Sequence, residues 1–476
     1  MTILRTYFAS DDFLHLYELV NLGPRELVLS PFGGHMCMVR NLVMAASFAL
    51  FGLEPRPFFA IVLATHMANT ALVFFVATGM GADVALAFLG AVLFALSPTH
   101  VAALDWYSVY GHVLSCFFTL LGLWLLVPRR DDSTDLGFGR ALSFALVMFA
   151  ASQAFGTGAG VALAAPVTAA VLRPRAFRRP IVAAMLCAIP IAVFLTARFL
   201  FFRPSPNNPD LSNYARLLLT FFWDVPDVTA MTAYLAALGS TALVLQSAYD
   251  PIDHPRLTTF IVPALLGAGF VVAVIRCDAG RRRALVALGV VLGATCAAIA
   301  FGRATMAHLL SSGGVIEAVR STPRYFYQVQ ALAAVLLVLV LDAVTRDARV
   351  LRGGLVAVTA TAVVLSYALH PPTIDHYHRQ RELVARVQQT ITDEVEAHAP
   401  GAPVCLSMDG RDDTLFWAAK NVFPGWAAIF MLLHPTDEVA GRRVYFTSAD
   451  EVALASRNPA GRIVSLLVPA GQCPPP

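Results

Sequence analysis

Long apolar runs dominate this chain and constrain its fold more than any other feature. A helix that crosses a bilayer needs about 17–25 mostly apolar residues, and fewer where neighbouring helices cover its ends. Only 14% of the residues are charged, against about 25% in a typical soluble protein. We therefore predict an all-α polytopic membrane protein with about ten spanning helices. The predicted spans are Phe58–Gly79, Val84–Leu96, Tyr107–Val127, Ala141–Phe155, Ala159–Leu172, Ile181–Phe202, Thr258–Ile275, Ala284–Phe301, Tyr327–Val344 and Gly354–Leu369.

The arginines predict how these helices are oriented, because basic residues collect in cytoplasmic loops. With the ten spans above, four arginine clusters fall on one side, and they are Arg129-Arg130, Arg173 to Arg179, Arg276 with Arg281 to Arg283, and Arg346 to Arg352. We therefore expect a multi-pass protein whose N-terminal loop and C-terminus lie outside the cytoplasm. The membrane is expected to be a bacterial inner membrane. Another apolar segment, Thr229–Gln246, would place the later arginine clusters outside the cytoplasm if it crossed the membrane. We expect it to lie on or dip into the outer surface.

Three regions follow from this scheme. Residues 1–57 form a first extracytoplasmic loop, 58–369 the membrane core, and 370–476 a small α/β domain outside the membrane. The predicted elements of that domain are helices over Arg381–His398 and Gly425–Leu433 and strands at Val404–Ser407, Val444–Thr447 and Arg462–Val468. An oxidising compartment would allow Cys405 and Cys473 to pair. The net charge of +3 is small and spread over short clusters, which argues against a nucleic-acid partner.

An acidic pair, Asp11 and Asp12, stands near the start of this apolar chain. Carboxylates beside a bilayer are costly unless they are solvated, paired or used. In one interpretation the pair supplies a general base that takes a proton from an acceptor hydroxyl. In the other it only stabilises the first turn of a helix over Phe13–Leu22, capped by Ser10, by about 0.3–1 kcal/mol.

Further polar residues are expected on the same outer face as the acidic pair. Histidine and arginine there suit binding of a phosphate group, although His66 is also suited to hydrogen bonding between helices and Trp106 to an interfacial aromatic belt. The candidate substrate-binding residues are His35, His66, His100, Asp105, Trp106, Arg324 and Tyr325. The apolar segment Met38–Leu53, interrupted by Arg40 and Asn41, is predicted to be an interfacial helix.

Several of these motifs occur in an order that resembles a known superfamily. Phe51-Gly52-Leu53-Glu54-Pro55 follows the acidic pair, then come His66 with Asn69, Pro98-Thr99-His100 with Trp106, and later Arg324-Tyr325. This order resembles the GT-C superfamily of polyprenyl-phosphate-sugar glycosyltransferases, especially the O-mannosyltransferase type. The chain departs from that pattern at Ala102 and Tyr110, where the family has a glutamate and an arginine. The family also has a spanning helix before the acidic pair, so we expect one upstream of Met1.

The resemblance implies an enzyme that transfers a sugar from a polyprenyl-phosphate donor to a hydroxyl of a lipid, glycan or protein acceptor, with inversion. It implies Asp11 or Asp12 as the base and Arg324, with His35 or His100, on the departing phosphate. No cofactor is required, and a divalent metal is left open. The alternatives are a transporter or lipid flippase without glycosyl transfer, and a membrane scaffold that presents the C-terminal domain.

Overall fold

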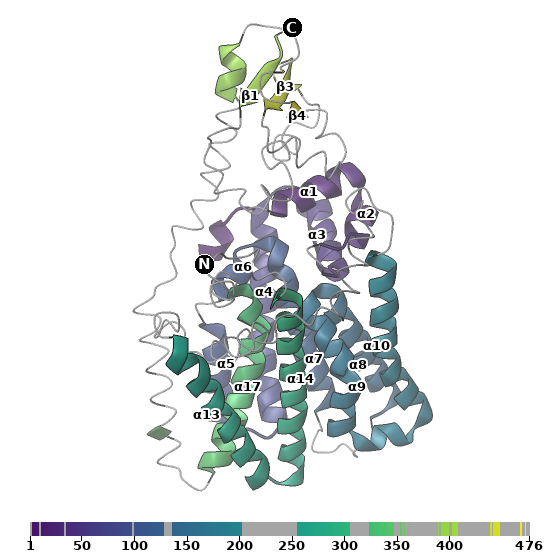
Figure 1. Ribbon diagram of the computed structural model, residues 1–476, viewed down its shortest axis with the longest axis vertical. Helices are drawn as coiled ribbons and strands as arrows, with labels where there is room; N and C mark the ends of the chain where they lie inside the picture. Colours follow the sequence, from purple (N-terminus) through teal and green to yellow (C-terminus); the bar gives the residue numbers. More distant parts are fainter. Residues whose placement is uncertain are drawn as a thin grey trace.

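The computed structural model describes residues 2–8, 11–32, 35–97, 100–127, 136–201, 255–304 and 323–346, together with short pieces between residues 353 and 472. Long helices run side by side in one bundle (Figure 1). Short helices from the start of the chain cover one end of this bundle, and a small sheet lies beyond them. The opposite end of the bundle carries the connections that the sequence predicts to be cytoplasmic.

The N-terminal segment folds into short helices above the bundle. Its elements are the 3₁₀ helix η1 (Thr2–Arg5) and the helices α1 (Asp11–Leu22), α2 (Pro24–Leu29) and α3 (Met38–Phe51). The predicted helix after the acidic pair is confirmed, and both aspartates lie in its first turn. At the end of α3, Gly52 has a φ of 59°. This is a left-handed conformation that glycine adopts without strain, and it turns the chain into the next helix.

The bundle itself consists of apolar helices. They are α4 (Pro55–Gly79), α5 (Val84–Ala95), α7 (Tyr110–Leu126), α8 (Phe138–Ala154), α9 (Gly156–Leu172), α10 (Pro180–Phe201), α13 (Pro255–Arg276), α14 (Ala279–Ala304) and α17 (Phe326–Thr345). Short turns α6 (Val101–Leu104), η3 (Tyr107–Val109), η4 (Pro174–Arg178) and η6 (Pro323–Tyr325) connect or precede them. The first nine predicted spans therefore all fall on helices.

Five helices among the described residues are long and apolar enough to cross a membrane. They are Pro55–Gly79, Tyr107–Leu126, Pro180–Phe201, Ala279–Ala300 and Phe326–Thr345. Shorter apolar helices, α5, α8 and α9 among them, stand between them. The tenth predicted span lies almost wholly outside the described residues, and so does the predicted surface segment Thr229–Gln246.

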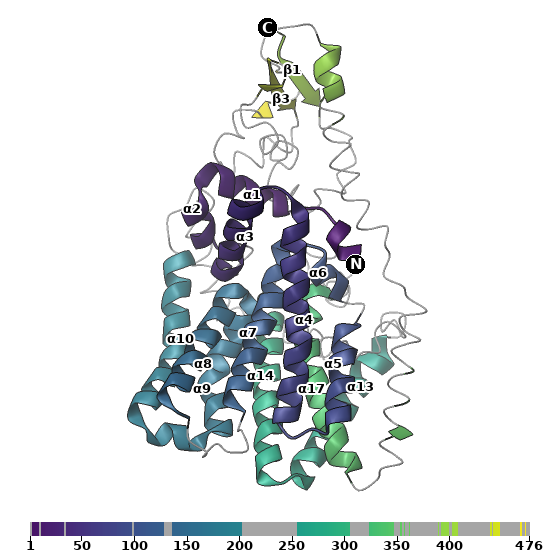
Figure 2. The same ribbon diagram turned by 180° about the vertical axis from the view of Figure 1, so that it is seen from behind.

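Packing in the bundle joins helices that are distant in the sequence. The most extensive contacts are those of α9 with α14 and α8, of α7 with α8, and of α4 with α7 and α5. Figure 2 shows α4 running along the back of the bundle with α5 beside it. Large apolar side chains point outward from several helices, among them Met67, Phe75, Phe88, Leu146, Ile181 and Phe194. An apolar exterior of this kind suits lipid rather than water.

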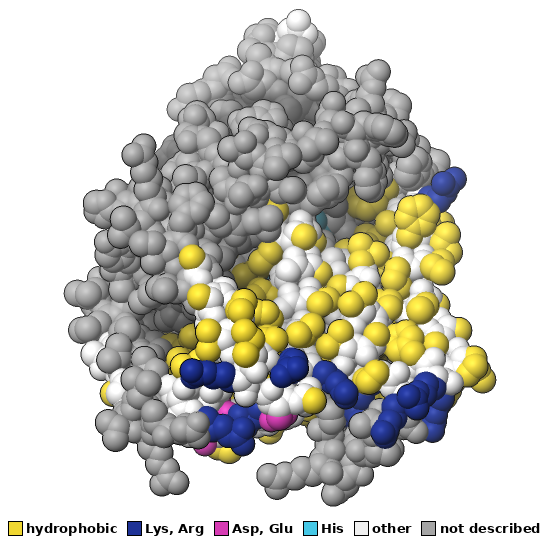
Figure 3. Space-filling model, turned by 60° about the horizontal axis from the view of Figure 1, so that its bottom comes forward, with side chains coloured by type: hydrophobic (Ala, Val, Ile, Leu, Met, Phe, Trp, Pro, Cys, Tyr) yellow, Lys and Arg dark blue, Asp and Glu magenta, His cyan; other side chains and the backbone are white. Residues whose placement is uncertain are grey.

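Arginines gather at the end of the bundle opposite α1 (Figure 3). Two arginines, Arg140 and Arg173, close the last turn of α7, where carbonyl groups have no partner within the helix. Arg140 donates to the carbonyls of Leu125 and Val127 at 2.5 and 2.7 Å. Arg173 is fully buried and donates to the carbonyls of Leu126 and Val127 at 2.8 and 2.9 Å. Arg281 forms an ion pair with Asp342 at 2.5 Å. Among the described residues, the exposed arginines of this end are Arg175, Arg178, Arg179, Arg276, Arg282, Arg283 and Arg346.

The C-terminal region contains a small sheet. Its strands are β1 (Val404–Ser407), β2 (Glu438–Val439), β3 (Arg442–Thr447) and β4 (Leu467–Val468). β3 is central, because it pairs in parallel with β1 and β4 and antiparallel with β2. Residues 392–397, within the predicted helix Arg381–His398, are helical, while the predicted helix Gly425–Leu433 lies outside the described residues. Cys405 is disulfide-bonded, and its expected partner Cys473 is also outside them.

Close packing of α9 gives a test of the bundle. A Cβ at Gly158 would lie 1.9 Å from the carbonyl oxygen of Ala151 on α8, whereas a Cβ at Gly293 on α14 would meet nothing within 4 Å. We expect Gly158→Ala to lower the free energy of unfolding by about 1–3 kcal/mol, the usual cost of overpacking. Thermal unfolding in detergent measures this effect.

Gly293→Ala is the matched control for Gly158→Ala. The substitution removes a flexible glycine from a helix interior without a clash, so it is expected to leave the melting temperature unchanged or raised. Equal melting temperatures for the two variants would contradict the observed packing of α8 on α9.

Candidate functional site

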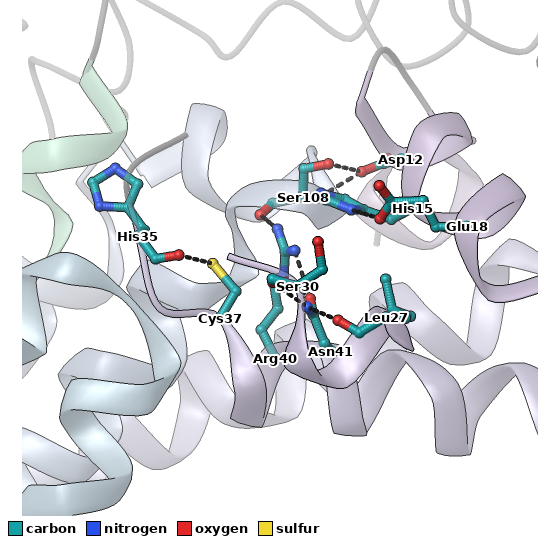
Figure 4. Close-up of polar contacts among 10 residues, drawn as sticks. All are labelled: Asp12, His15, Glu18, Leu27, Ser30, His35, Cys37, Arg40, Asn41 and Ser108. Carbon is teal, nitrogen blue, oxygen red and sulfur yellow. Dashed lines mark hydrogen bonds and ion pairs between the residues drawn. The ribbon is translucent and has the colours of Figure 1, made fainter. Parts of the chain in front are cut away.

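The acidic pair lies at the end of the bundle away from the arginines. α1 begins at Asp11, whose side chain is outside the described part of the chain, and Asp12 is fully buried. The backbone N–H and the hydroxyl of Ser108 both donate to Oδ1 of Asp12, at 2.5 and 2.8 Å (Figure 4). Two donors on one oxygen favour an ionised carboxylate. Asp12 therefore ties α1 to the start of α7.

A buried arginine holds Ser108 from the other side. Arg40 on α3 is fully buried, and its Nη1 donates to the carbonyl of Ser108 at 2.5 Å. Its Nε and Nη2 donate to Oδ1 of Asn41 at 2.9 and 2.6 Å. The amide of Asn41 in turn donates to the carbonyls of Leu27 and Ser30, at 2.6 and 3.3 Å. These contacts connect α2, α3, η3 and α1 in one hydrogen-bond chain.

Sequence reasoning missed the role of Arg40 and Asn41. It treated them as an interruption in an apolar helix. A signal was present, because an arginine and an asparagine inside an apolar run are costly unless something pairs with them. The partner, Ser108, lies 68 residues further along the chain, and no local pattern points to it.

Two more titratable groups of α1 are buried near Arg40. His15 Nδ1 lies 3.6 Å from Oε2 of Glu18, and the His15 ring meets Phe32 edge-on. Burial raises the pKa of Glu18 to about 7, against the opposing effect of Arg40. Burial, and then the charge of Arg40, hold the pKa of His15 well below its usual value. Near neutral pH, His15 is therefore uncharged and Glu18 partly protonated.

A second carboxyl group, Asp105, stands close to Asp12. It ends the short helix α6 and is buried, and burial raises its pKa to about 7, with a smaller contribution from the charge of Asp12. Trp106 follows directly, and the Arg324 guanidinium carbon lies 5.1 Å from the centre of its ring. The same group lies 5.4 Å from the Tyr325 ring. Two carboxyl groups and a cation thus share one neighbourhood, since η6 packs against α6.

Aromatic rings continue from Tyr325 toward α3. The ring of His112 meets Tyr325 edge-on at 4.9 Å and lies 3.9 Å from Phe155. Phe155 in turn lies 4.1 Å from His35. His35 is thereby joined to Arg324 and Tyr325, as the sequence led us to expect of residues on one face. His112 and Phe155 were missed, since each looks like an ordinary core residue in its helix pattern.

His66 and His100 form a second cluster, in which His66 lies near the middle of α4 and His100 directly precedes α6. His66 Nδ1 and the hydroxyl of Tyr327 are hydrogen-bonded at 2.6 Å, and Asn69 donates to the same hydroxyl at 3.2 Å. The His100 ring lies 4.6 Å from the Tyr327 ring and 5.5 Å from His66. His66 thus makes the hydrogen bond between helices that was the alternative interpretation of this residue. Burial, with a contribution from His66, holds the pKa of His100 well below its usual value.

The structure therefore brings Asp12, Asp105, Trp106, Arg324 and Tyr325 together, with His35 joined through a stack of rings. In the described part of the chain, no group of three or more His, Cys, Asp or Glu residues could hold a metal ion. No family model, curated protein or solved structure matches this chain.

The raised pKa of Asp105 predicts how stability varies with pH. A carboxyl group with a usual pKa of 3.8 and a folded-state pKa of about 7 binds its proton more tightly in the folded state. Its contribution to stability is complete below pH 4 and is lost as the pH rises through about 7. We expect Asp105→Asn to reduce the fall in melting temperature between pH 5 and pH 8.

Asp278→Asn is the control for this pH dependence. Asp278 caps the start of α14 at the other end of the bundle, with Oδ1 accepting from the N–H groups of Gly280 and Arg281. These bonds lower the pKa of Asp278, so the group stays ionised over the whole range. A pH 5 to pH 8 difference that is the same in wild type and Asp105→Asn would contradict the buried position of Asp105.

Proposed function

We propose that this protein is an integral-membrane glycosyltransferase that uses a polyprenyl-phosphate sugar as its donor. Its acceptor is a hydroxyl group of a lipid, a glycan or a protein. The reaction takes place at the end of the bundle that carries α1, which we propose faces outward from a bacterial inner membrane. Transfer inverts the configuration of the sugar carbon.

One observation carries this proposal: buried carboxyl groups and a cation meet at one end of an apolar bundle. Asp12 and Asp105 are close enough for the charge of one to affect the other, and Arg324 lies over Trp106, the neighbour of Asp105. A sugar phosphate at a membrane surface needs a base for the acceptor and a cation for the departing phosphate. Both kinds of group are present here, on helices that suit a lipid environment.

The chemistry follows from these residues. A carboxylate of the acidic pair takes the proton of the acceptor hydroxyl as its oxygen attacks the sugar carbon. The bond from that carbon to the phosphate oxygen breaks on the opposite face, which inverts the carbon. The Arg324 guanidinium, with two N–H groups that match phosphate oxygens, stabilises the charge that develops on the polyprenyl phosphate. The reaction requires no cofactor, and a divalent metal remains open.

Variants of the acidic pair test the proposed function. Sugar transfer is measured in membranes with a panel of radiolabelled polyprenyl-phosphate sugars. Loss of a general base typically costs 10²–10⁴-fold in rate, so we expect Asp11→Asn and Asp12→Asn together to reduce transfer about a hundredfold or more. The single variants then identify which aspartate is the base.

Asp83→Asn is a matched control for these variants. Asp83 also begins a helix, where its Oδ1 accepts from the N–H of Ala85, but it stands at the opposite end of the bundle. It is expected to transfer sugar at the wild-type rate. Undiminished transfer by the double Asp11, Asp12 variant would refute the base assignment, and a wild type inactive with every donor and acceptor would count against glycosyl transfer itself.

The proposed orientation has its own test. The exposed arginines at one end of the bundle and the disulfide-bonded Cys405 in the C-terminal sheet support a cytoplasmic arginine end and an external tail. Alkaline phosphatase is active only outside the cytoplasm. We expect activity when it is fused after residue 476 and none when it is fused within residues 173–179, and the reverse pattern would overturn this orientation.

A further inference from the structure

Helix α3 has its polar and apolar sides reversed relative to a helix on a soluble protein. Four of its exposed positions, Leu42, Ala46, Ala49 and Leu50, form one stripe at helical spacing, and Phe51 at its end is exposed as well. Its buried positions are Arg40, Asn41, Met44 and Ser47. Water on the outer side would favour the opposite arrangement. The sequence predicted an interfacial helix here, and the structure adds that its polar side faces the protein.

This reversal determines where the Arg40 guanidinium goes. A long arginine side chain at a membrane surface usually extends to water. Arg40 instead is fully buried and donates hydrogen bonds to the Ser108 carbonyl and to Oδ1 of Asn41. A buried cation is stable only when it is well hydrogen-bonded, so its geometry is fixed by the groups that it binds.

Ser108 is the point where this geometry reaches the acidic pair. Its carbonyl accepts from Arg40, and its N–H and hydroxyl donate to the Asp12 carboxylate. Asn41 holds Arg40 in turn, and is itself bound to the carbonyls of α2 and the turn after it. Figure 4 shows these side chains in one row from Asn41 to Asp12.

We propose that Arg40 and Asn41 are positioning residues, which hold the Asp12 carboxylate in place through Ser108. Neither touches the reacting atoms of the proposed reaction. Their role in transfer rests on the proposed function, but their hold on Asp12 does not. The competing explanation is that Arg40 only stabilises the fold, like any buried and hydrogen-bonded arginine.

Arg173 provides the control that separates these explanations. It is as fully buried as Arg40 and also donates to backbone carbonyls. It lies at the far end of α7 from Ser108 and closes the last turn of that helix. Replacing either arginine by methionine removes a buried cation and its hydrogen bonds, but only Arg40→Met removes the support of Ser108.

The first experiment measures the Asp12 carboxyl group directly. Carboxyl groups of the purified protein are labelled with a carbodiimide and glycine ethyl ester, and labelling is quantified residue by residue by mass spectrometry. We expect labelling of buried Asp12 to rise several-fold in Arg40→Met and to stay at the wild-type level in Arg173→Met. Asp278, with 57% of its side chain exposed, serves as the internal standard.

Unchanged Asp12 labelling in Arg40→Met overturns the proposal, and so does an equal rise in both arginine variants, which would mean a general loosening. If Arg40→Met does not fold, as judged by thermal unfolding, Asn41→Ala takes its place under the same criteria. This labelling needs no activity. A wild type that transfers no sugar would therefore refute the proposed function and leave the positioning role to be decided by labelling.

The second experiment uses the transfer reaction. Misplacement of a reacting group by about 1 Å can cost about a hundredfold in rate, so we expect kcat of Arg40→Met to fall by that order with little change in KM for the donor. Arg40→Lys keeps the charge but loses the fork, and is expected to recover part of kcat. A raised KM with unchanged kcat would overturn the positioning role.

Discussion

The hydrogen bonding of the buried Arg40 guanidinium is the interaction on which the end of the bundle that carries α1 depends. A hydrogen bond to a charged group typically contributes about 1.5–3 kcal/mol, which is a large part of the stability of an ordinary domain. Arg40 cannot be buried unless Ser108 and Asn41 are in place, and Ser108 in turn fixes Asp12. Four separate segments of chain therefore adopt their arrangement together or not at all.

Both ends of the bundle use a buried arginine to satisfy backbone carbonyl groups near α7. At each end, a fully buried arginine donates to the backbone near a terminus of α7. Arg40 donates to one carbonyl just before its start, and Arg173 donates to two carbonyls at its finish. Between them, hydroxyl and amide groups pair across helices, with Ser115 donating to Gln328 at 2.7 Å and Gln328 donating to Thr295 at 3.1 Å. In a membrane such pairs help to join helices, because apolar side chains gain little by leaving lipid for a neighbouring helix.

This pairing bears on the rival function of a transporter. Polar groups inside spanning helices often mark a transport path. Here the hydroxyl of Thr157 also donates to Ser115, at 3.1 Å, so the network joins α7, α9, α14 and α17. Its members bind one another, which gives them a structural role. The buried carboxyl groups near α1 are then the unusual feature of the described residues.

The sequence predicted those properties that depend on local pattern. Apolar runs placed the helices, and the acidic pair was correctly placed in the first turn of α1. Arg40 and Asn41 were not recognised, because their partners come from other segments and burial of a polar side chain is decided by tertiary contacts. For the same reason His112 and Phe155 were missed. The sequence also could not decide whether His66 binds a substrate or a neighbouring helix, because its hydrogen bond to Tyr327 depends on tertiary packing.

The environments of the two carboxyl groups suggest how they differ in chemistry. Asp12 receives two hydrogen bonds from Ser108 at one oxygen, which favours its charged form, while burial raises the pKa of Asp105 to about 7. Carboxyl groups whose surroundings separate their protonation in this way can act in one site as an ionised and a protonated partner. The charge of Asp12 itself helps to keep Asp105 protonated. One negative charge in this pair is thus favoured over two, and the hydrogen bonds from Ser108 favour its location on Asp12.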